Sequence, residues 1–167
     1  MTTTTGERAD ILDLLAKQRW LFTFTVKELS DEQARRRSIP STTLSLGGLI
    51  THVTLVEAQW ADFVEHGAPA GGGEPDYAAW AQGFVLGDDD TLARALEAYH
   101  AGAARTDELV RTVDLDASHP LPEAPWNPPG AVYTNRRVFL HVAAETAQHA
   151  GHADLLREAI DGQKTMG

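Results

Sequence analysis

Residues 137–158 read RVFLHVAAETAQHAGHADLLRE, and this stretch decides the fold class. Its apolar residues recur at intervals of three and four positions, as they do on one face of an α-helix. It contains no proline, and Gly162, just beyond it, is a residue type that commonly ends a helix. The spacing therefore predicts a long amphipathic helix that begins after Thr134 and ends at Gly162.

Three further stretches share this helical spacing, and no segment alternates apolar and polar residues as a half-buried strand would. We expect these long helices at residues 7–29, from near Ser45 to Gly67, and at residues 90–113. Each is amphipathic, so each must bury one face against another helix. The sequence therefore predicts an all-α fold, a four-helix bundle, and its length predicts a single domain over residues 1–167.

The connections carry weaker helical signals. Ser30 precedes Gln33 by three positions, which is the spacing of a capping box and predicts a short helix over residues 31–37. A second short helix is expected over residues 77–84. Residues 120–129 are rich in proline and cannot be helical throughout. We therefore expect short extra helices in some connections and an irregular connection before the last long helix.

The charge of the chain excludes two classes of partner. Lysine and arginine number 14 against 24 aspartates and glutamates, which gives a net charge of −10. An acidic surface repels phosphate backbones and anionic lipid, so we expect no nucleic-acid partner and no membrane partner. No apolar run reaches the roughly 20 residues that a membrane span needs, and residues 1–10 lack the pattern of a signal peptide. We therefore expect a cytoplasmic location.

Four ionisable side chains of the last helix fall on the side that we expect to face the core. A helical projection places them in the same arc as Val142, Leu155 and Leu156. They are His141, Glu145, His149 and His152. An unpaired buried carboxylate costs several kcal/mol or more, and a bound cation would offset that cost.

The spacing of Glu145 and His149 suits two ligands of one metal ion. They are four positions apart, which puts them on adjacent turns of one helix face. His52 lies on the apolar stripe of the second long helix and is the candidate third ligand. The spacing alone leaves other pairs open, either His141 with Glu145 or His149 with His152, and a simple hydrogen-bonded Glu–His pair is the alternative to any metal.

Two imidazoles and one carboxylate would leave a metal ion with open coordination positions. Open positions are typical of catalytic rather than structural sites. The donor set suits Zn²⁺, with Ni²⁺ and Fe²⁺ as alternatives. His141 and His152 would then orient the ligands or line the pocket beside the metal.

The chain resembles a known family at these residues. The matching blocks are LSDEQAR (29–35), SLGGLITHVTLVEAQW (45–60) and ETAQHAGHADLLREAIDG (145–162). They resemble the DinB-like metal-binding four-helix bundles. Within these proteins they resemble the branch that includes the mycothiol-dependent S-transferases and the N-terminal domain of mycothiol-dependent maleylpyruvate isomerase. In this branch the metal ligands correspond to His52, Glu145 and His149, whereas the wider superfamily usually has histidine in place of Glu145.

The resemblance implies an enzyme that transfers a low-molecular-weight thiol, mycothiol, to a small electrophile. A divalent metal would hold the thiol as a thiolate. The chain has no cysteine, so the nucleophilic sulfur must be supplied by a bound thiol. Arg137 is a candidate for binding a carboxylate of the thiol or the substrate, and Trp60 and Tyr133 are candidate pocket walls.

Two other functions fit the same scaffold. One is a non-catalytic protein that binds a metal or a small ligand. The other is a metal-dependent hydrolase, which would need Glu57 or Glu145 as its base. The sequence leaves open the identity of the electrophile, the native metal, whether the thiol is mycothiol, and whether the chain forms a homodimer.

Overall fold

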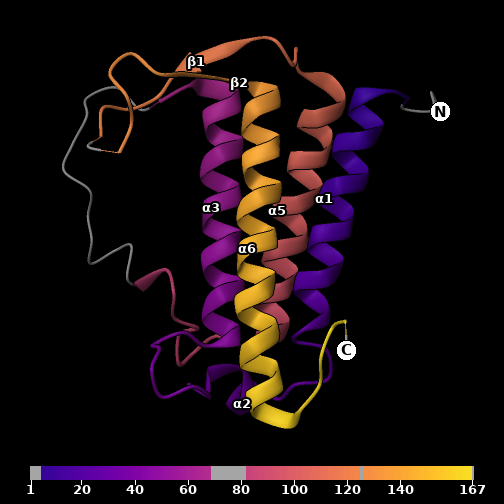
Figure 1. The fold of residues 1–167 in the computed structure, drawn as a ribbon, viewed down its shortest axis with the longest axis vertical. Coiled ribbons are helices and arrows are strands. Elements are labelled where there is room, and N and C mark those ends of the chain that lie inside the picture. Colours follow the sequence, from indigo (N-terminus) through magenta and orange to yellow (C-terminus); the bar gives the residue numbers. More distant parts are fainter. Residues whose placement is uncertain (1–4, 69–81, 125, 167) are drawn as a thin grey trace.

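The computed structural model describes residues 5–68, 82–124 and 126–166, and in this part of the chain four long helices lie side by side (Figure 1). They are α1 (Glu7–Phe24), α3 (Leu46–His66), α5 (Leu92–Thr112) and α6 (Asn135–Asp161). The all-α four-helix bundle predicted from the periodicity is therefore confirmed.

Each long helix packs against two others. α6 packs against α1 and α3, while α5 packs against the same two helices from the other side of the bundle. Two clusters of buried apolar side chains fill the interior. One contains Phe22, Leu49, Tyr99 and Leu156, and the other contains Leu15, Val64, Val110 and Phe139. The contact between α3 and α6 positions the three predicted metal ligands, which these two helices carry.

Side-chain caps fix the starts of three long helices. Ser45, Thr91 and Thr134 each accept a hydrogen bond from the backbone N–H three residues further on. Such caps satisfy N–H groups that have no partner within the helix. Gly67 and Gly162 end α3 and α6 with positive φ angles of 76° and 79°, which glycine adopts readily.

The first long helix is shorter than predicted. It ends at Phe24 rather than near Leu29, because buried Arg157 on α6 donates hydrogen bonds to the carbonyl oxygens of Thr25 and Lys27. These carbonyls are turned toward the guanidinium instead of continuing the helix. The short helix α2 (Asp31–Arg35) follows, with the predicted capping box of Ser30 and Gln33.

A small sheet lies at one end of the bundle and was not predicted. Strands β1 (Ser118–Pro120) and β2 (Val132–Thr134) pair antiparallel, with His119 opposite Tyr133. Strands of three residues are too short to show an alternating pattern, so the sequence gives no signal for them. The hairpin closes the long connection and places Tyr133 next to the first turn of α6 (Figure 1).

Two further expectations concern the second short helix and membrane-spanning segments. The predicted helix over residues 77–84 lies outside the described residues except for its last three positions. Among the described helices, none has the length and apolar character needed to cross a membrane.

Candidate functional site

The predicted ligands His52 and His149 meet where α3 packs against α6. Both are buried, with 6% and 8% of their surface exposed. Their ring centroids lie 4.9 Å apart and the ring planes are inclined at 72°. Two imidazoles bound to one tetrahedral zinc ion have centroids about 5 Å apart, since each Zn–N bond is about 2.0–2.1 Å long. The separation of the rings therefore suits a shared ion.

Glu145 lies between two imidazoles of its own helix. Its Oε1 is 3.5 Å from Nε2 of His141, and its Oε2 is 3.7 Å from Nε2 of His149. Both separations follow from the spacing of four residues along α6. The carboxylate therefore faces the ring nitrogen of His149 from one side, while His52 approaches the same ring from α3.

His152 contacts the opposite edge of the His149 ring. The two Nδ1 atoms lie 3.5 Å apart. A histidine that binds a metal through one ring nitrogen usually uses the other in a hydrogen bond that fixes its orientation. With Nδ1 of His149 facing His152, its Nε2 is the nitrogen that points toward Glu145.

Burial keeps the histidines of this site neutral. It lowers the pKa of His52 to about 4, and the neighbouring His149 contributes to that shift. It also lowers the pKa values of His149 and His141, although Glu145 acts in the opposite direction on both. The neutral imidazole is the form that binds metals. At neutral pH all three side chains are therefore in that form.

The helical projection made from the sequence misplaced the centre of the buried face of α6. Leu155, which we placed in the core-facing arc, is 60% exposed, whereas Thr146 and Ala153 are buried. The buried face is rotated because α6 also packs against α1. His141, Glu145 and His152 consequently lie at the edge of that face and are half-buried, and only His149 of the four is buried.

Phe84 covers His52 and was not identified from the sequence. The two rings are stacked, with centroids 3.7 Å apart and planes inclined at 15°. The chain can approach α3 here because residue 48 is glycine. A Cβ atom on Gly48 would collide with the carbonyl oxygen of Phe84. A loop phenylalanine has no periodic pattern, so only the fold reveals this contact.

An aromatic group extends the site along α6 toward the hairpin. Trp60 stacks on Tyr133 at 5.9 Å, and its ring meets that of His141 at 4.7 Å with planes 72° apart. The guanidinium of Arg137 lies over the ring of Tyr133, 4.7 Å from its centroid. The structure thus brings together three residues predicted as pocket groups, Arg137, Trp60 and Tyr133, beside His141.

A buried ion-pair network crosses the bundle interior and was also missed. Arg19 donates to Glu57 at 2.5 Å and to Asp107 at 2.6 Å. Glu57 is 1% exposed, and burial together with its charge raises the pKa of Tyr99. Arg19 occupies the same helix face as Leu15 and Phe22, which is a signal that the sequence did contain. The carboxylate of Glu57 is therefore paired with Arg19 and is not available as the base that a hydrolase would require.

A second group of metal-binding residue types lies on the exposed surface of α3. Asp62, Glu65 and His66 form the one trio in the described chain whose ligand atoms all lie within 4.8 Å of one another. Both carboxylates pair with Arg105, which offsets one of their two negative charges. The ligand atoms of His52, Glu145 and His149 are more widely spaced than that limit, so a shared ion would require a side chain to rotate.

The described helices define an all-α four-helix bundle, with a cluster of histidines and one carboxylate where α3 packs against α6. Over residues 10–162 the sequence matches the mycothiol-S-transferase family, and the chain belongs to that family. The search of curated proteins found no match.

A solved structure supports the fold independently. The chain is similar to a crystal structure described as the conserved protein of locus from Enterococcus faecalis, with a TM-score of 0.71. The match covers 96% of this chain and 100% of the other, at 14% sequence identity. At this identity the likeness establishes the bundle and nothing about its chemistry.

Proposed function

We propose that the protein is a metal-dependent S-transferase that joins mycothiol to a small electrophile. The observation that carries this proposal is the meeting of His52 and His149 beside Glu145, in a chain of the mycothiol-S-transferase family. The family supplies the thiol and the reaction class. The three side chains supply a place where the thiol could be activated.

His52, Glu145 and His149 would hold a divalent metal ion. Two neutral imidazoles and a carboxylate suit Zn²⁺, and Ni²⁺ or Fe²⁺ can use the same donors. The meeting of the His52 and His149 rings supports a ligand set that joins α3 to α6. When bound, such an ion deprotonates a coordinating thiol, so that the sulfur is held as a nucleophilic thiolate.

The neighbouring residues orient these ligands. His152 contacts Nδ1 of His149, so that Nε2 of His149 is directed toward the proposed metal ion. His141 contacts Oε1 of Glu145 and leaves Oε2 for the ion. Neither residue touches the reacting atoms in this proposal, so both are positioning residues.

Arg137 and Tyr133 are suited to bind the polar part of the thiol or a carboxylate of the substrate. Within the described residues the guanidinium of Arg137 contacts Tyr133 and no carboxylate, although the chain carries a net charge of −10. Its guanidinium rests on Tyr133 and is exposed. One of its N–H groups donates to the hydroxyl of Tyr133 at 3.5 Å. A guanidinium that is held in place and has further donors can bind an anionic or hydroxyl-rich group.

The reaction is a displacement. With monochlorobimane as the electrophile, the thiolate sulfur forms a bond to the chloromethyl carbon while the carbon–chlorine bond breaks, and chloride leaves with the bonding electrons. The thiol proton passes to solvent. No oxidant or reductant is required.

The test compares wild-type protein with His52→Ala at a fixed concentration of Zn²⁺, mycothiol and monochlorobimane. We expect the variant to lose the enzyme-dependent rate. His66→Ala, which removes an exposed histidine outside the candidate metal site, is the matched control and should keep the rate. Equal rates for wild-type and His52→Ala would overturn the proposal.

A further inference from the structure

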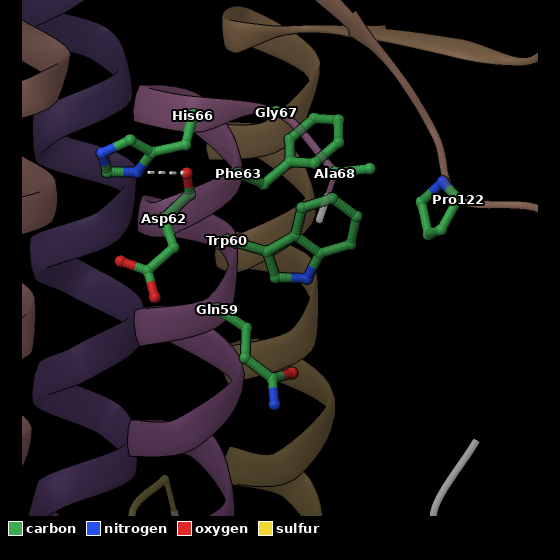
Figure 2. Close-up of a pocket in the computed structure, with 8 residues that line it drawn as sticks. All are labelled: Gln59, Trp60, Asp62, Phe63, His66, Gly67, Ala68 and Pro122. Carbon is green, nitrogen blue, oxygen red and sulfur yellow. Dashed lines mark hydrogen bonds between the residues drawn. The ribbon is translucent and has the colours of Figure 1, made fainter. Parts of the chain in front are cut away.

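An apolar pocket opens beside Trp60 on the outer side of α3. It has a volume of about 710 Å³, within the range of small-molecule sites. Figure 2 shows the side chains of Trp60, Phe63, Ala68 and Pro122 around the hollow, with the amide of Gln59 at one end. The pocket surface is thus mostly aromatic and aliphatic, and the amide of Gln59 is its uncharged polar side chain.

Asp62 and His66 are also among the residues that line the pocket, but their side chains project toward the other side of α3 in Figure 2. Asp62 pairs with Arg105, and Nδ1 of His66 lies 3.2 Å from the carbonyl oxygen of Asp62. A charged or hydroxyl-rich molecule would therefore lose its hydration in the pocket without gaining matching hydrogen bonds.

The pocket walls are held by contacts behind them. Trp60 is stacked on Tyr133, and the ring of His119 packs edge-on against Phe63 at 5.6 Å. Nε2 of His119 lies 3.3 Å from the carbonyl oxygen of Val64, which fixes that ring against α3. The hollow is consequently formed before any ligand binds.

Helical spacing places the pocket residues Gln59 and Phe63 on the same face of α3 as His52. Gln59, at its nearer end, is seven residues beyond His52, a distance of about 10 Å along the helix axis at about 1.5 Å per residue. Trp60 also contacts His141, which contacts Glu145, so the pocket wall is continuous with the candidate metal site. A molecule that reacts near His52 could therefore extend into the pocket.

We propose that this pocket binds the uncharged, apolar body of the electrophile and so selects ring-containing electrophiles. The inference rests on the proposed function. It assigns the pocket to the electrophile because the thiol, mycothiol, is a hydroxyl-rich sugar conjugate for which the lining offers one amide. Arg137 and Tyr133, on the far side of Trp60, remain for the polar thiol.

The first test measures binding without metal and without thiol. Monochlorobimane is titrated by calorimetry into EDTA-treated protein, and because the chain has no cysteine the probe binds without labelling it. Ala68→Trp and Gln59→Trp fill the hollow from two ends. We expect each to weaken binding about tenfold or more, since an aromatic ring loses its buried surface. Ala98→Trp, on the exposed side of α5, should leave it unchanged.

The second test measures selectivity in the transfer reaction. Ala68→Trp should raise the KM for monochlorobimane about tenfold and leave unchanged the KM for mycothiol and for iodoacetamide, which has no ring. An equal effect on both electrophiles, an effect on mycothiol alone, or unaltered calorimetric binding in both filled variants overturns the proposal. If wild-type protein shows no transfer at all, the proposed function fails, and the calorimetry alone decides whether the pocket binds apolar electrophiles.

Discussion

The imidazole of His52 contacts two rings, one stacked on its face and one that meets it edge-on. Phe84 lies face to face with it at 3.7 Å, and His149 meets it at 4.9 Å with ring planes 72° apart. Residues that orient a metal ligand affect metal affinity although they do not touch the ion. Phe84 is therefore part of the candidate metal site.

Replacing Phe84 by alanine should weaken metal binding. Without the stack the His52 ring loses one of the contacts that orient it, and the loss of an orienting partner typically reduces affinity about 10–100-fold. The Zn²⁺ dissociation constant, measured by competition with a chelating dye, checks this. Val85→Ala, at the neighbouring exposed position, is the control and should bind zinc as wild-type does. Unchanged affinity in Phe84→Ala would contradict a positioning role.

Gly48→Ala should lower both thermal stability and zinc affinity. Its Cβ would collide with the backbone of Phe84, so the segment that carries Phe84 must move away from α3. Gly102→Ala is the matched control, because a Cβ at that helical position meets nothing within 4 Å. The control should be more stable by about 0.5–1 kcal/mol, the usual gain from alanine over glycine in a helix. Thermal unfolding measures the stability of both variants. Similar effects of the two substitutions would contradict the account.

The metal-free protein should lose stability as the pH falls from about 6.5 toward 4. His52 has a pKa of about 4 in the folded protein, against 6.5 in the unfolded chain. Between these values the unfolded chain binds a proton that the folded protein does not, so acid favours unfolding. Urea denaturation in EDTA at pH 7 and pH 5 measures the loss. His52→Asn should show a smaller difference between the two pH values, and an identical difference would contradict the assigned shift.

Breaking the buried pair of Arg19 and Glu57 should be costly. Glu57→Gln removes the charge that faces Arg19 in the interior, and such a change typically costs about 3–5 kcal/mol of unfolding free energy. Asp107 continues to pair with Arg19, which places the expected loss at the lower end. Glu7→Gln is the control, because it removes the partner of Arg136 from an exposed pair, typically worth about 1 kcal/mol or less. Equal losses in urea denaturation would refute the importance of the buried network.

The architecture could be predicted because its signals are local. The spacing of apolar residues predicted all four long helices, and Ser30, Ser45 and Thr134 marked where three helices begin. The errors came from tertiary contacts. Arg157 ends α1 early by binding the carbonyls that follow it, and a single-helix projection cannot show that α6 faces two partners and exposes Leu155.

The candidate site could be predicted only in part. The ligand types on α6 follow from their spacing, and the buried face of α3 led to His52. The stack of Phe84 on His52 requires a loop to cross α3 at Gly48, which no pattern within either segment specifies. The pocket beside Trp60 likewise combines α3 with Pro122 from the irregular connection.

Metal binding by His52 and His149 is the central claim, and a Co²⁺ titration tests it most directly. Metal-free wild-type protein should bind one Co²⁺ per chain, and adding mycothiol should produce the near-ultraviolet absorption of cobalt bound to a thiolate. His52→Ala and His149→Ala should lose both signals, while His66→Ala should keep them. Stoichiometric binding and the thiolate absorption in His52→Ala, or no binding by wild-type protein, would contradict the account.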